Sequence, residues 1–527
     1  MKSRNNLTSA TISICAMLLS ALLFVQAPSA IAGTIYDFEL LDNGRVIADN
    51  GNDTAFPSVI RVPSWIPPAE RADADANYYM YYGNHGGERI RMKWAQSLEG
   101  PWTTFDLGGE YNGRNRRGVF DIDADSTRDT YDHVSAPDVH VDEANQQIVM
   151  YFHGQNQPST TTSGGTSVPR KHESFVTTSA SGLNFNDPTH AGGESGHGPK
   201  TVTVDDITRD IWIGEDYQRA FEVDGSWYSI GKRGIINASP NPLDPWAPLA
   251  GNPFGEAWTR ESTPSSLWTS DANPGGQDDY YSPAASFIAS SEFAAHPRNP
   301  LPGERVLSNG NDERFNHVSV NLISPDALEI FFYVREANSS APDRYDDLYR
   351  VVLDVSDSDF ENWEVARDST GQAYFDVVIS AEELHAAVET ANGIGSDPDD
   401  YADPVSLGDS DIFVDEDGSK YLFLSYVSDQ NGGALGEGQI TGVKLNLHPD
   451  FNYDDEFDGL DFLQWQRGDS FSPLSESDLA AWQTSYGASL NSLAVTNSVP
   501  EPSSSLLLLM VLAFVPRRNV MKNAWSA

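Results

Sequence analysis

Oxygen-bearing side chains recur at short, regular intervals near the end of the chain. They fall at positions one, three, five, nine and twelve of a single loop: Asp450, Asn452, Asp454, Asp458 and Asp461. Calcium prefers about six to eight oxygen ligands, and this spacing wraps the chain around one ion. We therefore expect one Ca²⁺ site here. The alternative is a solvated acidic linker.

A second group of carboxylates lies at or just before the starts of predicted strands. Four of them are candidates for acid–base chemistry: Asp138, Glu215, Asp216 and Asp409. Hydrolysis of a glycosidic bond usually needs two carboxyl groups, one as the acid and one as base or nucleophile. Asp409 opens an Asp-Ser-Asp segment, which offers a carboxylate pair at one strand start. The alternative for each is an ordinary turn or loop carboxylate.

Basic and imidazole side chains share these positions. Four are candidates for substrate binding: His133, Arg219, Arg314 and His317. A cluster that mixes Arg, His and Asp suits an anionic or heavily hydroxylated glycan. Each residue taken alone is an ordinary structural hydrogen-bonding group.

The elements that must position these side chains are pairs of short strands joined by turns. Five such hairpins are predicted, with their strands at 58–62 and 78–82, 138–141 and 148–152, 220–223 and 227–230, 318–322 and 329–333, and 412–414 and 421–424. Asp-Gly turns in two of them are strong hairpin signals. Repeated antiparallel units without helices between them predict a mainly β fold and favour a propeller. A β-sandwich is the alternative.

Three features of this region resemble the five-bladed glycosidase superfamily, which includes arabinanases, β-xylosidases, invertases and levansucrases. They are the Asp-Gly hairpins, the Ser97–Trp102 segment and the Ser135–Val139 segment. The resemblance implies a five-bladed β-propeller over residues 34–446 with carboxylates pointing into a central funnel. It also implies that Asp138 is the family's middle Asp, which tunes the pKa of the acid.

The same resemblance implies a glycoside hydrolase that acts on an extracellular poly- or oligosaccharide. One departure concerns the first blade, where the family has Asp-Pro and this chain has Phe56-Pro57. That departure favours the alternative, a non-catalytic glycan-binding or cell-surface propeller.

A small helical module follows, over residues 447–488. The segment 461–466 is echoed by 478–483, and together with the calcium loop this repeat resembles a type I dockerin. The resemblance implies a cohesin-like partner. Arg467 and Phe471 stand at ligand positions of the second loop, which is therefore expected to bind no ion.

Both ends of the chain carry sorting patterns. Residues 1–32 have a basic start, a short apolar run and an Ala-Ile-Ala site, the parts of a secretory signal peptide. After a linker at 489–498, residues 499–527 combine Pro-Glu-Pro, a short apolar run and two arginines, and resemble a PEP-CTERM signal. That resemblance implies an exosortase-type protease. We expect a secreted or cell-surface protein, held transiently in the membrane; a plain anchor at either end is the alternative.

Charge and length narrow the function classes. The chain has 77 acidic against 33 basic residues, a net charge of -44, so nucleic acid is not an expected partner. Its single cysteine lies within the predicted signal peptide, so the mature chain is expected to have no disulfide. A chain of 527 residues is long enough to be stabilised by its hydrophobic core instead.

Overall fold

The computed structural model divides the chain into two compact units, residues 1–448 and residues 449–527, and each is described by itself. The residues described are 36–44, 47, 54–84, 87, 89–108, 110–111, 114–115, 118–121, 131–156, 172–185, 196–199, 201–204, 207–210, 212–214, 217–231, 236–239, 283–288, 290–296, 316–333, 347–368, 371–392, 406–427, 438–451, 457–467, 470 and 476–487. The predicted signal peptide, linker and sorting segment lie outside them. No helix within these ranges is long and apolar enough to span a bilayer.

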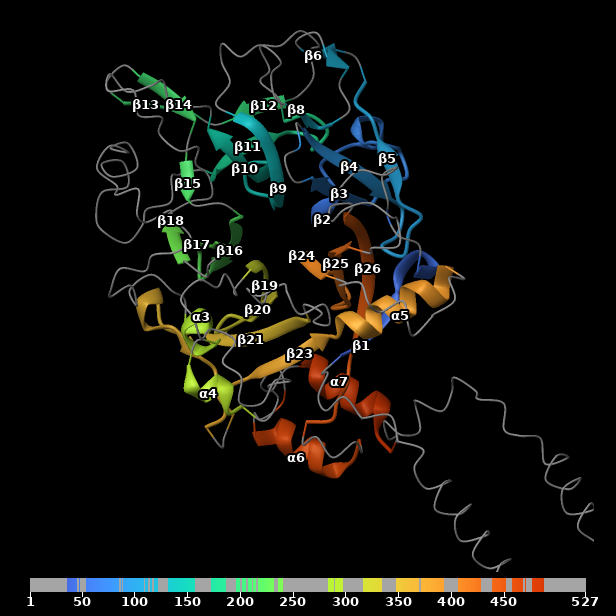
Figure 1. Cartoon of the computed structure of the whole chain (residues 1–527), viewed down its shortest axis with the longest axis vertical. Helices are drawn as coiled ribbons and strands as arrows, with labels where there is room; N and C mark the ends of the chain where they lie inside the picture. Colours follow the sequence, from blue (N-terminus) through green and yellow to red (C-terminus); the bar gives the residue numbers. More distant parts are fainter. Residues whose placement is uncertain are drawn as a thin grey trace, which may run out of the picture. The chain divides into compact units, whose positions relative to one another are not determined.

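Antiparallel sheets make up most of the first unit (Figure 1). One contains β2 (Ala55–Arg61), β3 (Tyr78–Gly83), β4 (Arg89–Ala95) and β5 (Thr103–Phe105), with β8 (Phe120–Asp121) beside β4. The next contains β9 (Tyr131–Asp142), β10 (Gln147–Asn156), β11 (His172–Ser179) and β12 (Gly196–Pro199), with β15 (Trp212–Gly214) beside β11. The third contains β16 (Arg219–Val223), β17 (Ser226–Ile230) and β18 (Ile236–Ser239).

Two further sheets complete the set. One contains β19 (Asn316–Ser324), β20 (Ala327–Tyr333), β21 (Leu348–Asp354) and β22 (Glu364–Val365), with β23 (Phe375–Ile379) beside β21. The other contains β24 (Ser406–Val414), β25 (Lys420–Val427), β26 (Gly438–Leu447) and β1 (Tyr36–Leu40), so it joins both ends of the unit. Two ribbons stand apart, β6 (Glu110–Tyr111) with β7 (Arg114–Asn115) and β13 (Thr201–Val204) with β14 (Ile207–Asp210).

These pairings confirm the prediction of a mainly β, propeller-like fold. The five-blade prediction holds only in part, because four sheets have the four or five strands of a full blade and the third has three. Local sequence explains the hairpins. The aromatic run of β3 is buried along its whole length, as expected for a strand covered on both faces. Asp224 and Gly225 adopt φ of 50° and 78°, the paired positive angles of a type I′ turn.

Helices between the sheets were not predicted, and here the sequence-based expectation was wrong. A 12-residue helix, α5 (Ala381–Asn392), lies between β23 and β24. Two short helices, α3 (Pro283–Ile288) and α4 (Ser291–Ala294), precede β19. In α5 the residues Ala381, Leu384 and Val388 are buried, which is a single apolar stripe at helical spacing. Such a narrow stripe gives a weak signal amid acidic residues.

The first strands of the sheets, β2, β9, β16, β19 and β24, lie innermost in Figure 1. Contacts join β2 to β9, β16 to β19, β19 to β24 and β24 to β2. The pairing of β2, β9, β19 and β24 with the second strand of each sheet shifts register at an equivalent point, and β9 and β19 have a second shift elsewhere. Residues with positive φ mark an equivalent point within three first strands, at Phe56, Ala136 and Asp409, and just before β16, at Tyr217, with angles of 59°, 47°, 51° and 59°. A bulge bends its strand and re-aims the following side chain.

The residue two positions after each of these angles points toward the neighbouring first strand. We call this set, completed by its counterpart on β19, the ring residues: Ser58, Asp138, Arg219, Ser319 and Asp411. Four of them accept a backbone N–H from the next first strand, at 2.9 Å from Val139 to Ser58 Oγ and at 2.7 Å from Ala220 to Asp138 Oδ2, from Ile412 to Ser319 Oγ and from Val59 to Asp411 Oδ2. Polar side chains thus link the sheets where their inner edges meet.

A buried ionic network lies away from this centre. Arg350 and Glu329 have no exposed surface, and Arg350 Nε lies 2.8 Å from Glu329 Oε2. Arg350 Nη1 also contacts Asp376 Oδ2 at 3.2 Å. Lys420, from the sheet that holds β1, places its Nζ 2.6 Å from Glu329 Oε1. Burial alone raises the pKa of Glu329, but the charges of Lys420 and Arg350 outweigh it and lower the pKa below its usual value.

The described part of the second unit contains two helices, α6 (Gly459–Arg467) and α7 (Glu476–Ser485). The rings of Phe462 and Trp482 stack at 4.7 Å between them. Trp482 Nε1 also donates to the Asp458 carbonyl oxygen at 2.6 Å, which ties α7 to the start of α6. The Gly487 N–H also donates to the Phe457 carbonyl oxygen at 2.8 Å, so an aromatic contact and hydrogen bonds join the two helices.

Candidate functional site

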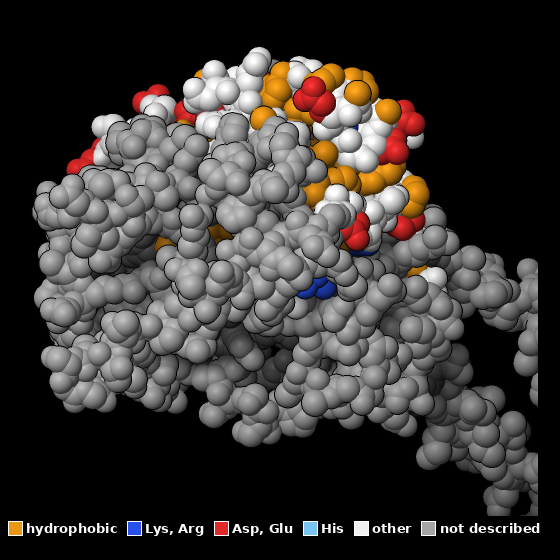
Figure 2. Space-filling model, turned by 90° about the horizontal axis from the view of Figure 1, so that it is seen from above, with side chains coloured by type: hydrophobic (Ala, Val, Ile, Leu, Met, Phe, Trp, Pro, Cys, Tyr) orange, Lys and Arg blue, Asp and Glu red, His pale blue; other side chains and the backbone are white. Residues whose placement is uncertain are grey.

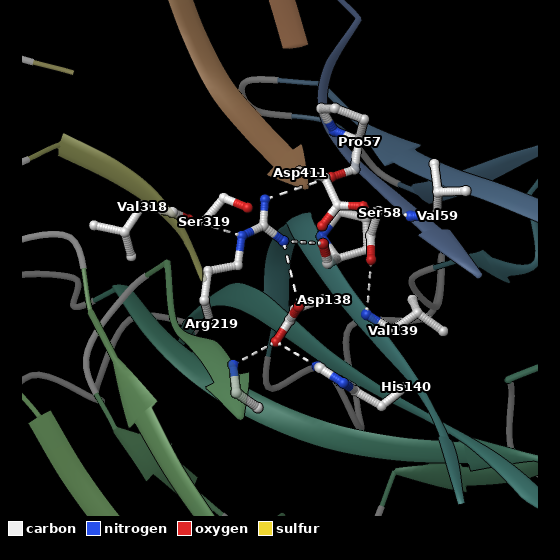
Figure 3. A network of polar contacts seen from close by, with 12 residues as sticks. Pro57, Ser58, Val59, Asp138, Val139, His140, Arg219, Val318, Ser319 and Asp411 are labelled. Atoms are coloured by element: carbon white, nitrogen blue, oxygen red, sulfur yellow. Dashed lines mark hydrogen bonds and ion pairs between the residues drawn. The ribbon is translucent and has the colours of Figure 1, made fainter. Parts of the chain in front are cut away.

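A guanidinium group occupies the centre of the inner strands (Figure 3). Arg219 lies at the start of β16, and its side chain is only 8% exposed. It donates to one backbone carbonyl on each of the other four first strands: Nη1 to Pro137 at 2.8 Å, Nε to Val318 at 3.2 Å, and Nη2 to Pro57 and to Ser410 at 3.4 Å each. Arg219 Nη1 also lies 3.6 Å from Asp138 Oδ1. Four hydrogen bonds and one ion pair with protein groups thus surround a guanidinium that has five donors.

Asp138 is the more enclosed of the two ring carboxylates. Its side chain is 6% exposed, and its Oδ2 accepts hydrogen bonds from the Ala220 N–H and from His140 Nε2, the latter at 3.0 Å. Burial alone raises the pKa of Asp138, but the charge and hydrogen bond of His140, together with Arg219, lower it below its usual value. Burial lowers the pKa of His140, and Asp138 more than reverses this, so His140 titrates above its usual value. Each member of the pair therefore favours the charged form of the other.

Asp411 has the opposite character. Its Oδ2 accepts the Val59 N–H at 2.7 Å, and the residue is partly exposed. Desolvation by the surrounding protein outweighs the favourable charge of Arg219 and raises the pKa of Asp411 to about 7. Asp138 pushes in the same direction because it is already negative. The pKa values of two ring residues, Asp138 and Asp411, are therefore shifted in opposite directions. Such a pair can provide one protonated acid and one ionised carboxylate at the same pH.

An aromatic cluster lies two residues before the ring residues Ser58 and Arg219 in the sequence. Phe56 is buried, its ring 5.3 Å from that of Tyr217, and Tyr217 stacks on His153 at 4.6 Å. Asp409 is buried as well, and its Oδ2 accepts from Ser425 Oγ at 3.4 Å. Phe56 stands where the resembled family has its Asp, so a hydrophobic ring occupies that position here.

The structure brings together some of the predicted site residues. Asp138 and Arg219 are in contact, and Asp409 lies two residues before Asp411, which is the member of the Asp-Ser-Asp pair that joins the ring. His133 and His317 lie on β9 and β19, but their side chains are outside the description. Three other predicted residues, Glu215, Asp216 and Arg314, lie outside the described residues altogether.

Sequence reasoning did not single out His140, and of the aspartate pair at the start of β24 it named Asp409, whereas the side chain that reaches β2 is that of Asp411. Strand alternation could have found His140, since it lies two residues after Asp138 and therefore on the same face. The choice between Asp409 and Asp411 depends on the bulge between Gly408 and Asp411, which shifts the alternation and leaves no local signature.

The predicted calcium ligands are only partly described. Asp450 is buried and Asp458 partly exposed, whereas Asn452 and Asp454 lie outside the described residues. Asp461 is fully buried, and its two oxygens accept the N–H groups of Phe451 and Asp458 at 2.8 and 2.7 Å. No group of three or more potential metal-ligating side chains gathers within the parts that are described. Calcium binding therefore stays a prediction.

The raised pKa of Asp411 has a measurable consequence for stability. A carboxyl whose pKa is higher in the folded state stabilises the fold fully below its unfolded pKa of 3.8, and this is lost as pH rises through about 7. We expect Asp411→Asn to lack that loss. Relative to the wild type, the variant should gain roughly 2–4 kcal/mol between pH 4 and pH 8. Urea unfolding at both pH values measures the difference, and a constant difference would contradict the assignment.

Comparison with known proteins gives distant similarities. No family model matches the chain. An uncharacterized protein of Acanthamoeba polyphaga mimivirus is 27% identical over 229 residues, which are 41% of this chain and 53% of that protein. The chain thus spans about half the length of the curated relative that it matches.

Among solved structures, an alpha-L-arabinofuranosidase from Lactobacillus brevis is 10% identical, with 79% of this chain and 92% of that chain covered and a TM-score of 0.36. An alpha-L-arabinofuranosidase from Podospora anserina, in complex with cellotriose, is 7% identical, with coverages of 79% and 99% and a TM-score of 0.36. An alpha-L-arabinanase from Cellvibrio cellulosa is 12% identical, with coverages of 87% and 99% and a TM-score of 0.33. The sequence identities and the TM-scores are both low, so these similarities carry no argument about the activity of this chain.

Proposed function

We propose that the chain is a secreted glycoside hydrolase that acts on an extracellular poly- or oligosaccharide, with Asp411 as the proton donor. The observation that supports this is the opposed pKa shift of Asp411 and Asp138 within one ring of strands. A general acid works best when its pKa lies near the working pH, because it is then protonated often enough and still gives up its proton. Glycosidic hydrolysis is the reaction class that uses such a carboxyl pair.

Asp411 is better suited to meet substrate than Asp138. It is partly exposed, and among the described residues its Oδ1 has no hydrogen-bond partner. Asp138 has both oxygens engaged by protein groups and acts on this proposal through its charge. A base or nucleophile is still needed, and Glu215 and Asp216, just before β16, remain the predicted candidates. We also propose that β16–β18 form a fifth, smaller blade, because Arg219 of β16 reaches all four other first strands.

A specific observation favours a second candidate function, a non-catalytic glycan-binding propeller. Phe56 replaces the carboxylate that the resembled family uses in its first blade, and it is fully packed against Tyr217. The donors of Arg219 and the oxygens of Asp138 are also occupied by protein groups. A protein with this ring could hold a glycan without cleaving it.

Cleavage and binding assays on the same preparation separate the two functions. The full-length secreted chain is incubated with plant and algal oligosaccharides, new reducing ends are measured, and binding of each glycan is measured by calorimetry. Release of reducing ends supports the hydrolase. Binding without cleavage across the panel supports the second function, and neither binding nor cleavage would contradict both.

The charge on the surface is compatible with a neutral or weakly charged glycan as partner. Acidic side chains are scattered among apolar and neutral ones on the described part of the face in Figure 2. The net charge of -44 opposes the approach of nucleic acid and other polyanions. Export through residues 1–32, exosortase processing at 499–527 and a cohesin-like partner for residues 447–488 remain proposals that rest on the sequence patterns.

We further propose that the loop from Asp450 to Asp461 binds one Ca²⁺. Calorimetry on the full-length chain, freed of metal with a chelator, should show a single site. Asp454→Ala should abolish it, because a short loop has no spare oxygen ligands. Asp469→Ala, at the place in the second repeat that corresponds to Asn452, should leave binding unchanged. Two sites in the wild type, or none, would refute the assignment.

A further inference from the structure

The ring of side-chain links between the first strands is interrupted at one position. Ser58, Asp138, Ser319 and Asp411 each accept an N–H from the next strand. Arg219 has no acceptor to offer, since a guanidinium only donates. Its link to the next strand has the opposite direction: the Nε–H of Arg219 donates to the Val318 carbonyl oxygen on β19.

The remaining donors of Arg219 extend this reversed link to the whole centre. Each carbonyl that Arg219 binds belongs to the residue just before a ring residue: Pro57, Pro137, Val318 and Ser410. One side chain from the three-stranded sheet thus binds the corresponding backbone position on the first strands of the four larger sheets. Such a planar fork with fixed donor directions is available to Arg and not to Lys, whose ammonium is a single point with three donors.

The same group sets the charge balance at the centre. The ionisable groups around it are Asp138 and His140 on β9, Asp411 on β24 and Tyr151 on β10, whose ring lies 5.8 Å from that of His140. The positive charge of Arg219 favours the ionised forms of both aspartates and disfavours a charged His140. Its charge therefore acts on three titratable groups of the candidate site, Asp138, His140 and Asp411.

We propose that Arg219 is the positioning residue of this centre, which holds the first strands at a common distance from one another and sets the electrostatic field in which Asp138 and Asp411 act. The second half of this proposal rests on the proposed function, because it assigns the field to those two carboxyl groups as acid and partner. Arg219 touches no substrate on this view. This differs from the expectation, drawn from the sequence, that Arg219 binds the sugar.

Two substitutions separate the bonding geometry from the charge. Arg219→Met removes both, whereas Arg219→Lys keeps the charge and loses the fork. Arg367→Met is the control, because Arg367 pairs with Glu292 at the surface, where both side chains are more than 40% exposed. Two quantities are measured on the full-length chain. The first is the thermal midpoint. The second is the pH midpoint of the His140 titration, recorded by NMR on histidine-labelled protein, with the His140 signal assigned by its loss in His140→Gln.

Arg219→Lys and Arg219→Met are both expected to lower Tm by roughly 2 to 5 °C, and Arg367→Met by at most about 1 °C. The His140 midpoint should rise by about one unit in Arg219→Met and stay in place in Arg219→Lys. If Arg219→Met does not fold, the Lys variant alone decides: a lowered Tm with an unmoved His140 midpoint supports the proposal. A Lys variant as stable as the wild type, or a Met variant with an unmoved midpoint, would overturn it.

Neither readout depends on hydrolysis. If the wild type cleaves no glycan while Tm and the His140 midpoint respond as expected, the hydrolase proposal fails and the positioning role of Arg219 stands. If cleavage occurs and both readouts are unmoved, the positioning role fails and the hydrolase stands.

Discussion

Asp411→Asn is expected to lower kcat for glycan hydrolysis by about a hundredfold to ten-thousandfold, the usual cost of removing a general acid. The reason is that an amide can still accept the Val59 N–H through its oxygen but has no proton to give. The fold should therefore survive the change. Asp417→Asn is the matched control, because Asp417 lies in the exposed turn after β24 and bonds only to nearby groups such as Ser419. Steady-state kinetics on both variants, with circular dichroism as a check of folding, tests the assignment.

The pH dependence of the wild type gives an independent check of the same role. A general acid must be protonated, so activity should fall as pH rises through about 7, the pKa of Asp411. Asp138→Asn removes a negative charge that holds this pKa up, and the alkaline limb should then move to lower pH. The same variant should also be less stable, since Asp138 links β9 to β16 and pairs with His140. An Asp411→Asn enzyme with wild-type kcat would exclude Asp411 as the acid.

The largest expected effect on stability is that of Arg350→Met. This substitution leaves two buried carboxylates, Glu329 and Asp376, with Lys420 as the one positive charge that the structure places against Glu329. Removing one partner of a buried ionic network typically costs about 3–5 kcal/mol, because desolvated charge loses its compensation. Denaturant unfolding of the full-length chain should show this loss, or the variant should fail to accumulate in folded form.

Arg367→Met provides the matched control for this prediction. Arg367 also pairs with a carboxylate on another element, Glu292, but both side chains are more than 40% exposed. An exposed ion pair is worth about 0–1 kcal/mol, because water and salt screen it. An equal loss of unfolding free energy in Arg350→Met and Arg367→Met would contradict the prediction, because it would show that burial does not strengthen the network around Glu329.

Much of the fold could be predicted from local patterns. The hairpin formed by β16 and β17 follows from the Asp224-Gly225 turn, whose two positive φ angles few other pairs adopt easily. The buried strand β3 follows from an unbroken aromatic run, and α6 and α7 follow from two echoing segments. The helix α5 was missed because its buried stripe has only three clear apolar positions among acidic neighbours.

The site divides along the same line. The sequence by itself determined which strands carry polar residues at their starts, and it singled out Asp138 and Arg219, because turn chemistry and strand alternation are local properties. Only the tertiary structure decided what these residues do. The donors of Arg219 meet carbonyls from strands up to 191 residues away in sequence, and the pKa of Asp411 depends on burial against β2 and on the charge of Asp138. Such contacts arise when distant strands converge, and solvation and charge at that meeting point leave no trace in local spacing.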